Sequence, residues 1–191
     1  MNRLLLTLLL LFGTCTVAVA DDLNDGIAAF QSEDYATALA KLTKAAEPGN
    51  ADAQTLLASM YRKGLGVPQY YGQAAHLLKK AAEAGNQDAQ YGLGGMYERG
   101  LGMTQDYQQA ARWYTKAAEA GDTGAQYCLS TLYYAGKGVP MDYMQAYMWA
   151  NLAASKGGER EVENREAIAT FMTPAQIAEA QKLAREWKPK K

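Results

Sequence analysis

Few residues of this 191-residue chain have the type and spacing that catalysis or metal binding requires. His76 is the one histidine, so a metal site or a histidine-based catalytic triad would depend almost on this side chain alone. None of the serines, Ser32, Ser59, Ser130 and Ser155, is followed three residues later by the lysine of the S-x-x-K nucleophile motif. We therefore expect a protein with no catalytic residue, no metal site and no cofactor.

The two cysteines give one free thiol to consider. Cys15 lies in the N-terminal apolar segment, so residues 21–191 contain Cys128 alone and no disulfide within the chain is possible. Two interpretations of Cys128 stay open. It either pairs with a partner or a second copy, or it is a small, inert, half-buried residue. A dimer that is lost on reduction would decide for the first.

A Gly-x-Gly element occurs three times and invites comparison with phosphate-binding loops. None of the three follows a predicted strand, and none has the third glycine or the Lys-Ser/Thr pair that such loops need. They recur at a spacing of 36 residues, which marks them as the loop of a repeated unit. The pairs are Gly64/Gly66, Gly100/Gly102 and Gly136/Gly138.

The repeated unit occupies three consecutive blocks, residues 51–86, 87–122 and 123–158. The first two blocks are identical at 20 of 36 positions, and twelve columns are identical in all three. Leu57 and Tyr61, four residues apart, share one helical face, and the glycines end that helix. Asp106 and Asp142 stand where a second helix needs an N-cap, while Tyr70 replaces the aspartate in the first block. Each block therefore predicts helix, loop, helix and turn.

The flanking segments complete the array. Residues 21–50 match the second half of the unit and predict a helical hairpin whose first helix runs from about Gly26 to Gln31. Residues 159–191 predict a polar helix over 159–171, then a helix that begins at Thr173 with a capping box and ends in a basic tail. This segment either covers the apolar edge of the last repeat or binds a partner.

The middle block shows the repeated pattern most fully, in Ala89-Gln90, Leu93-Gly94, Met96-Tyr97, Gly100-Leu101-Gly102, Asp106-Tyr107, Ala110, Trp113-Tyr114 and Lys116-Ala117-Ala118. This pattern resembles the Sel1-like repeat (SLR) family, a relative of the tetratricopeptide repeat. The resemblance covers about residues 25–158. It implies an all-α, right-handed α/α superhelical solenoid that acts as a protein–protein scaffold without naming its partner.

Residues 1–20 have the features of a secretory signal peptide. Arg3 precedes a nine-residue apolar stretch, and Ala18-Val19-Ala20 is an A-x-A cleavage site. The stretch is short for a membrane span. We expect the protein to be exported to the periplasm of a Gram-negative bacterium. The net charge of −1 excludes a strong electrostatic case for nucleic-acid or acidic-lipid binding.

Comparison of the three blocks separates fixed columns, which build a core, from variable ones. In helical-hairpin solenoids the first helices line the concave face, which receives extended peptides or helices. Tyr134 is the best single anchor there, and Gly92 and Gly95 would leave room in the middle. Solvated variation explains the same stripe equally well. Its members are Leu56, Ser59, Arg62 and Lys63, then Gly92, Gly95, Glu98 and Arg99, then Cys128, Thr131 and Tyr134.

These observations predict a non-catalytic adaptor that holds a protein or peptide in the bacterial cell envelope. The alternative is a peptidoglycan- or β-lactam-binding protein, which the resemblance to cysteine-rich SLR proteins suggests. Against that alternative stand the absence of paired cysteines from residues 21–191 and of an S-x-x-K motif. A self-associating structural module is a third possibility.

Overall fold

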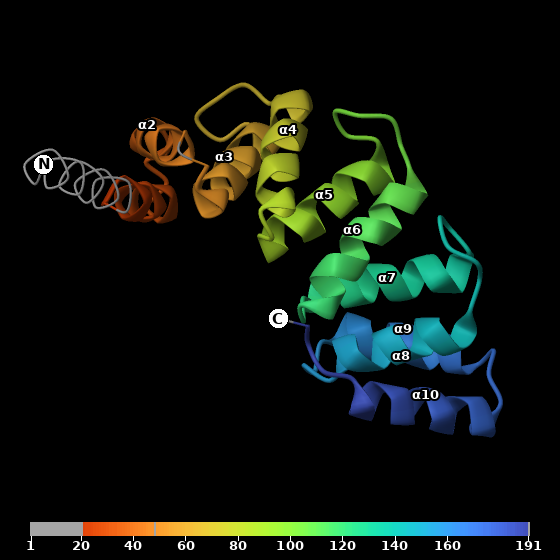
Figure 1. Cartoon of the computed structure of the whole chain (residues 1–191). Coiled ribbons are helices and arrows are strands. Elements are labelled where there is room, and N and C mark those ends of the chain that lie inside the picture. The colour runs from red at the N-terminus through yellow and green to blue at the C-terminus, as the bar shows by residue number, and fades with distance from the viewer. Residues whose placement is uncertain (1–20, 48, 191) are drawn as a thin grey trace, which may run out of the picture. The chain divides into compact units, whose positions relative to one another are not determined.

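The computed structural model of the protein describes residues 21–47 and 49–190, so the predicted signal peptide lies outside the described residues. Within them every regular element is a helix. The chain divides into two compact units, unit 1 ending at Asn86 and unit 2 starting at Gln87, and each is described by itself. Figure 1 shows the helices, which are residues 21–31, α2 (Tyr35–Ala46), α3 (Ala51–Lys63), α4 (Tyr71–Glu83), α5 (Gln87–Arg99), α6 (Tyr107–Glu119), α7 (Thr123–Ala135), α8 (Tyr143–Ala154), α9 (Glu159–Ala169) and α10 (Pro174–Glu186).

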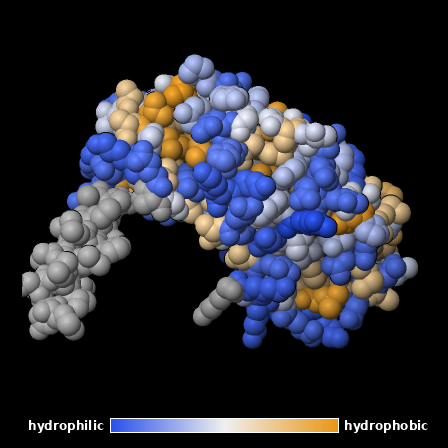
Figure 2. All heavy atoms as spheres, turned by 45° about the horizontal axis from the view of Figure 1, so that its top comes forward, coloured by the Kyte–Doolittle hydropathy of each residue, from blue (hydrophilic) through white to orange (hydrophobic). Residues whose placement is uncertain are grey.

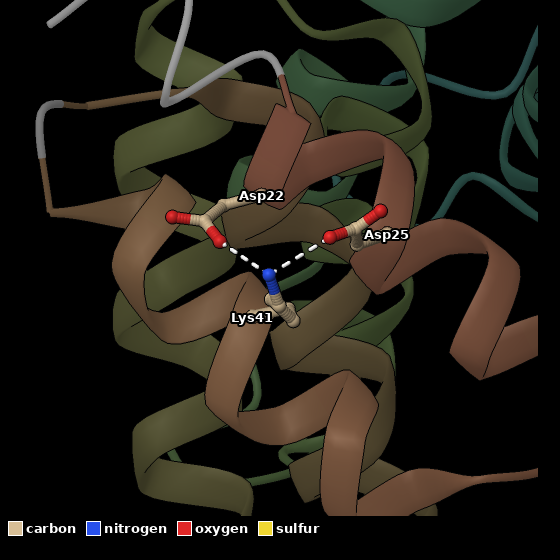
Figure 3. Close-up of polar contacts among 3 residues, drawn as sticks. All are labelled: Asp22, Asp25 and Lys41. Atoms are coloured by element: carbon tan, nitrogen blue, oxygen red, sulfur yellow. Dashed lines mark hydrogen bonds and ion pairs between the residues drawn. The ribbon is translucent and has the colours of Figure 1, made fainter.

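Unit 1 begins with the N-terminal hairpin. Its first helix is already formed at Asp21, so the predicted start near Gly26 is wrong. Gly26 lies inside the helix and is buried. A Cβ at this position would come within 2.8 Å of the Leu42 side chain on α2. The glycine therefore permits close packing of the two helices. Lys41 of α2 joins them as well, since its Nζ donates to Asp22 at 2.9 Å and to Asp25 at 2.8 Å (Figure 3).

The second helix of each repeat starts as its N-cap predicts. Asp106 accepts hydrogen bonds from Gln108 N and Gln109 N at 2.9 and 3.0 Å, and Asp142 caps α8 in the same way. Tyr70 has the same extended backbone conformation but makes no capping bond. The replacement of the aspartate by Tyr70 therefore leaves α4 without a side-chain cap.

The Gly-x-Gly loops return the chain so that two helices of one repeat lie side by side. All six glycines have positive φ, between 64° and 72°. In each repeat the backbone N–H of the N-cap residue donates to the carbonyl of the tyrosine that recurs near the end of the first helix, as Asp106 does to Tyr97 at 3.0 Å. A Cβ on Gly138 would overlap the backbone of Tyr107, so this loop packs directly against the start of the preceding hairpin's second helix. The recurring glycines thus have a structural role, as expected.

The core of unit 2 is built from the fixed columns. Leu93 and Leu129 are fully buried, and the alanines of α6 and α8 are buried around them, which lets the helices approach closely. Tyr114 is also fully buried, and its ring lies against Gly94, where a Cβ would come within 2.7 Å. A large residue on α6 is matched by the absence of a side chain on α5.

The C-terminal helices pack on α8. Ile168 of α9 and Ala180 of α10 join a buried cluster with Ala146 and Tyr147. Ala184 of α10 belongs to the neighbouring cluster that contains Trp149. The predicted capping box at the start of α10 is present. These contacts cover apolar side chains of the last repeat, which supports the capping interpretation of this segment.

Candidate functional site

The predicted stripe of variable residues divides between the two units. Leu56, Ser59, Arg62 and Lys63 lie on α3 of unit 1, where the first three are half-buried and Lys63 is exposed. The other members lie in unit 2. Gly92, Gly95, Glu98 and Arg99 are on α5, and Cys128, Thr131 and Tyr134 are on α7.

In unit 2 Tyr114, which sequence reasoning did not select, links the two halves of the stripe. Its hydroxyl donates to Glu98 Oε2 at 2.6 Å. Burial, reinforced by the neighbouring Cys128 and Glu98, raises the pKa of Tyr114 far above that of a free tyrosine. The phenol therefore stays neutral and holds the Glu98 carboxylate in place. The sequence signal was Gly94, whose missing side chain is the space that the Tyr114 ring occupies.

Gly95 does not leave the open room that we expected. It is buried, and a Cβ there would meet the Arg99 guanidinium at 2.9 Å and the Tyr114 hydroxyl at 3.4 Å. The arginine four residues along α5 folds back over the glycine. The middle of this face is therefore covered by a charged side chain next to the Tyr114–Glu98 pair.

Cys128 has the environment of a structural residue. It is half-buried and packs against the apolar core that contains Leu129 and Tyr114. Burial is the main cause that raises the pKa of its thiol. Because the thiolate is the reactive form, this environment disfavours nucleophilic chemistry and supports the interpretation of Cys128 as an inert residue.

Tyr134 is part of a partly exposed aromatic cluster. Its ring centroid lies 5.8 Å from that of Tyr143 and 5.5 Å from that of Phe171, and Tyr143 and Phe171 stack at 5.3 Å with a 19° angle between their planes. Tyr134 is 37% exposed and Phe171 is 53% exposed, while Tyr143 is half-buried. The rings come from α7, from α8 and from the turn after α9. We call them the three-ring cluster. The sequence indicated only Tyr134, because Tyr143 belongs to a fixed column and Phe171 lies outside the repeats.

Helix α9 also borders this face of α7. The Arg160 guanidinium lies 3.9 Å from the centre of the Tyr127 ring, and Asn164 Nδ2 donates to Ser130 Oγ at 2.7 Å. Ser130 is fully buried, so this bond satisfies a polar group inside the protein. The face around the three-ring cluster thus combines residues of α7, α8 and α9.

The described residues contain a single histidine, His76, and a single cysteine, Cys128. Among them no group of three or more histidine, cysteine or acidic side chains is placed to hold a metal ion. His76 is exposed on α4. None of the helices in residues 21–47 and 49–190 is long and apolar enough to cross a membrane. Figure 2 shows a mostly hydrophilic face on which apolar residues gather in separate patches.

Comparison with known proteins agrees with the repeat structure. The family model for the Sel1 repeat matches residues 51–86, 87–122 and 123–158. No curated protein matches the chain. A crystal structure of a Sel1 repeat protein from Oxalobacter formigenes is 32% identical, with a TM-score of 0.72 over 80% of this chain and 61% of that one.

Two further solved structures are similar. The c5321 protective antigen of uropathogenic Escherichia coli, which has an SLR fold, is 31% identical, with a TM-score of 0.60 over 80% of this chain and 40% of that one. Cysteine-rich protein B of Helicobacter pylori is 28% identical, with a TM-score of 0.53 over 68% of this chain and 93% of that one. The chain thus spans less than two thirds of the length of the first two relatives.

These similarities confirm the predicted fold class, an all-α solenoid of helix-loop-helix repeats. Proteins built from such repeats are generally scaffolds that mediate protein–protein interactions. The repeat model covers more than half of the residues, and each match begins and ends in step with the internal period. The chain belongs to the Sel1 repeat family.

Proposed function

We propose that this protein is a non-catalytic adaptor that binds a protein or peptide partner in the bacterial cell envelope. The observation that carries the proposal is the three-ring cluster of Tyr134, Tyr143 and Phe171. Aromatic side chains are prominent among the residues that dominate the binding energy of protein interfaces, and here Tyr134 and Phe171 are exposed together and pack against the half-buried Tyr143. Their mutual packing restricts each ring before a partner arrives, which lowers the entropy cost of binding.

The partner surface that suits this cluster is apolar and extended. The three rings supply flat contact area, while Arg160 beside Tyr127 and Glu98 beside Tyr114 carry opposite charges elsewhere in unit 2. Specificity then rests on shape and on a few directional hydrogen bonds. Arg62 and Lys63 of unit 1 remain predicted members of the partner-binding surface.

The envelope location rests on the sequence of residues 1–20, with its A-x-A site before Asp21. Intact-mass measurement of the protein from its native host tests it. A mature chain that begins at Asp21 is expected, whereas a chain that keeps its initiator methionine, or one that begins at Cys15 with an added lipid, would contradict it. The alternative, a protein that binds peptidoglycan or β-lactams, stays a prediction. No contact among the described residues supports it.

The adaptor function is tested by capturing the mature protein from cross-linked cells and identifying its partner by mass spectrometry. The partner's affinity for purified protein is then compared for Tyr134→Ala and for Tyr70→Ala, a matched control at another exposed tyrosine. We expect Tyr134→Ala to weaken binding by a factor of about 10 or more, and Tyr70→Ala to leave it unchanged. Equal affinity of both variants and wild type would remove the cluster from the binding surface.

A further inference from the structure

A cavity of about 560 Å³ lies in unit 1 among α2, α3 and α4. The end of α2 and the turn after it contribute Glu47 and Gly49 to its lining, α3 contributes Tyr61, and α4 contributes Leu77 and Lys80. Glu47 and Lys80 are exposed and charged, while Leu77 is buried. The cavity therefore combines an apolar floor with one acidic and one basic group at its rim.

The internal repeat gives this cavity a counterpart in unit 2. Two repeat lengths further along the chain, Glu47 corresponds to Glu119 and Gly49 to Gly121. In the same way Leu77 corresponds to Trp149. The counterpart lies among α6, α7 and α8, so the two places have the same position relative to their hairpins.

In unit 2 the chain's own C-terminal segment covers these residues. The backbone N–H of Lys190 donates to the Glu119 carbonyl at 2.8 Å, and Lys190 Nζ donates to Glu119 Oε1 at 2.6 Å. Pro189 is the nearest neighbour of the position that a Cβ on Gly121 would take, at 3.9 Å. The Trp187 ring packs edge-on against Trp149, with 6.2 Å between ring centroids. An extended segment with a tryptophan and, three residues later, a lysine thus fits this place.

The substitutions between the two places favour an occupant of the same kind in unit 1. Leu77 is smaller than its counterpart Trp149, so unit 1 has more space for an aromatic side chain. Glu47 keeps the carboxylate that binds lysine in unit 2. Lys80 replaces Leu152, which adds a cation that suits an acidic residue in the occupant. The chain's own segment has one in Glu186, directly before Trp187.

We propose that the unit 1 cavity binds an extended segment of a partner protein that carries an aromatic residue and, three residues later, a lysine. The aromatic side chain lies over Leu77 and the lysine pairs with Glu47. This inference rests on the proposed adaptor function and specifies the partner's chemistry at one site. The C-terminal segment of a second copy is the less favoured occupant, because it would have to give up the contacts with Glu119 and Trp149 in its own unit 2.

The test uses the full mature chain and a labelled synthetic peptide with the sequence of residues 184–190, Ala-Arg-Glu-Trp-Lys-Pro-Lys. Fluorescence anisotropy is expected to show one binding site. Glu47→Lys should weaken binding by about 10- to 100-fold, since it replaces a charge-assisted hydrogen bond by repulsion. The matched control Glu163→Lys makes the same charge change at an exposed position of α9 and should have no effect. No binding to wild type, or equal binding to Glu47→Lys, would overturn the proposal.

A second variant checks the equivalence of the two places. A chain that ends at Glu186 lacks the segment that covers unit 2, and circular dichroism verifies that it is folded. It should bind two peptides, and Glu47→Lys in the same background should bind one. A truncated chain that binds one peptide whether or not Glu47 is changed would show that only the unit 2 place takes this segment.

Two further outcomes distinguish this proposal from self-association and from the adaptor function alone. A dimer of the intact chain in sedimentation that Glu47→Lys abolishes would assign the cavity to a second copy and overturn the assignment to a separate partner. A cellular partner whose capture requires Tyr134 but is unaffected by Glu47→Lys would leave the adaptor function standing while this inference fails. A partner that contains the aromatic–lysine spacing and is lost with Glu47→Lys supports both.

Discussion

At the scale of single residues, size matching between neighbouring helices decides the packing of unit 2. Tyr114 occupies a column that holds Leu78 and Ala150 in the other repeats. Its ring is accommodated because the facing position on α5 is Gly94. A pair of this kind is visible in a sequence only when the contact is already known, which is why Tyr114 was missed as a member of the site.

The Gly94–Tyr114 contact predicts a stability change. Gly94→Ala adds a methyl group 2.7 Å from a ring that is buried and unable to move away. We expect a loss of about 1–2 kcal/mol in the free energy of unfolding, measured in urea, because overpacking outweighs the gain in helix propensity. Gly72→Ala on α4 is the control, since its nearest neighbour is the exposed Tyr70 ring, and it should be neutral or stabilising. Equal effects of both substitutions would contradict the packing account.

The Tyr114–Glu98 bond predicts a dependence on alkaline pH. The pKa of Tyr114 is raised in the folded protein, so its stabilising effect is present below the pKa of the unfolded chain, about 10, and is lost as the pH rises above it. Above about pH 10 wild-type stability should fall more steeply than that of Tyr114→Phe. At neutral pH this variant should be about 1–2 kcal/mol less stable, because it lacks the hydrogen bond to a carboxylate.

Urea unfolding at a series of pH values measures both effects. Tyr70→Phe, which changes an exposed tyrosine, should keep the wild-type slope. Parallel curves for wild type and Tyr114→Phe would show that the buried phenol does not contribute to the pH dependence.

At the scale of elements, local signals predicted the helices well. The structure has the predicted N-caps Asp106 and Asp142 and the predicted capping box at Thr173. Tyr70, which replaces the aspartate in the first repeat, makes no capping bond. The start of the first helix was wrong because Gly26 was treated as a helix boundary. It serves instead as the point where that helix contacts Leu42 of α2, and such a contact between helices leaves no signal in local sequence.

The missing cap of α4 can be supplied. Tyr70 has φ −143° and ψ 92°, close to the φ −150° and ψ 102° of Asp106. Tyr70→Asp should therefore cap α4 and raise the free energy of unfolding by about 0.5–1 kcal/mol, whereas Tyr70→Ala should not. Thermal and urea unfolding measure the difference. A loss of stability in Tyr70→Asp that matches the loss in Tyr70→Ala would show that the exposed ring, rather than the cap, matters at this position.

The C-terminal helices predict a second effect at this scale. Truncation after Gly158 removes Ile168, Ala180 and Ala184 and exposes apolar side chains of α8, including Tyr147 and Trp149. We expect a lower melting temperature and concentration-dependent aggregation in light scattering. A soluble monomer with an unchanged melting temperature would mean that α9 and α10 are not a cap, and would favour their role in partner binding.

At the scale of the whole molecule, the repeat period determined what could be predicted. Self-similarity at 36 residues was enough for the fold class and for the family, since each unit buries its apolar columns against its neighbours. The proposed binding surface was predicted only in part. Tyr134 was selected by comparing repeats, but Phe171 lies outside them, and its proximity to Tyr134 comes from the packing of α9 on α8. Tail contacts such as Lys190 with Glu119 also join residues far apart in the sequence.

The adaptor function requires that the three-ring cluster of unit 2 contacts a protein partner in the cell. The most direct test places a photo-cross-linking amino acid at position 134 of the full chain in its native host, with the more exposed position 70 as the control. After irradiation, we predict one discrete cross-linked protein from position 134 and none from position 70. Cross-links that are absent at both positions, or the same mixture of proteins at both, would contradict the adaptor function at this surface.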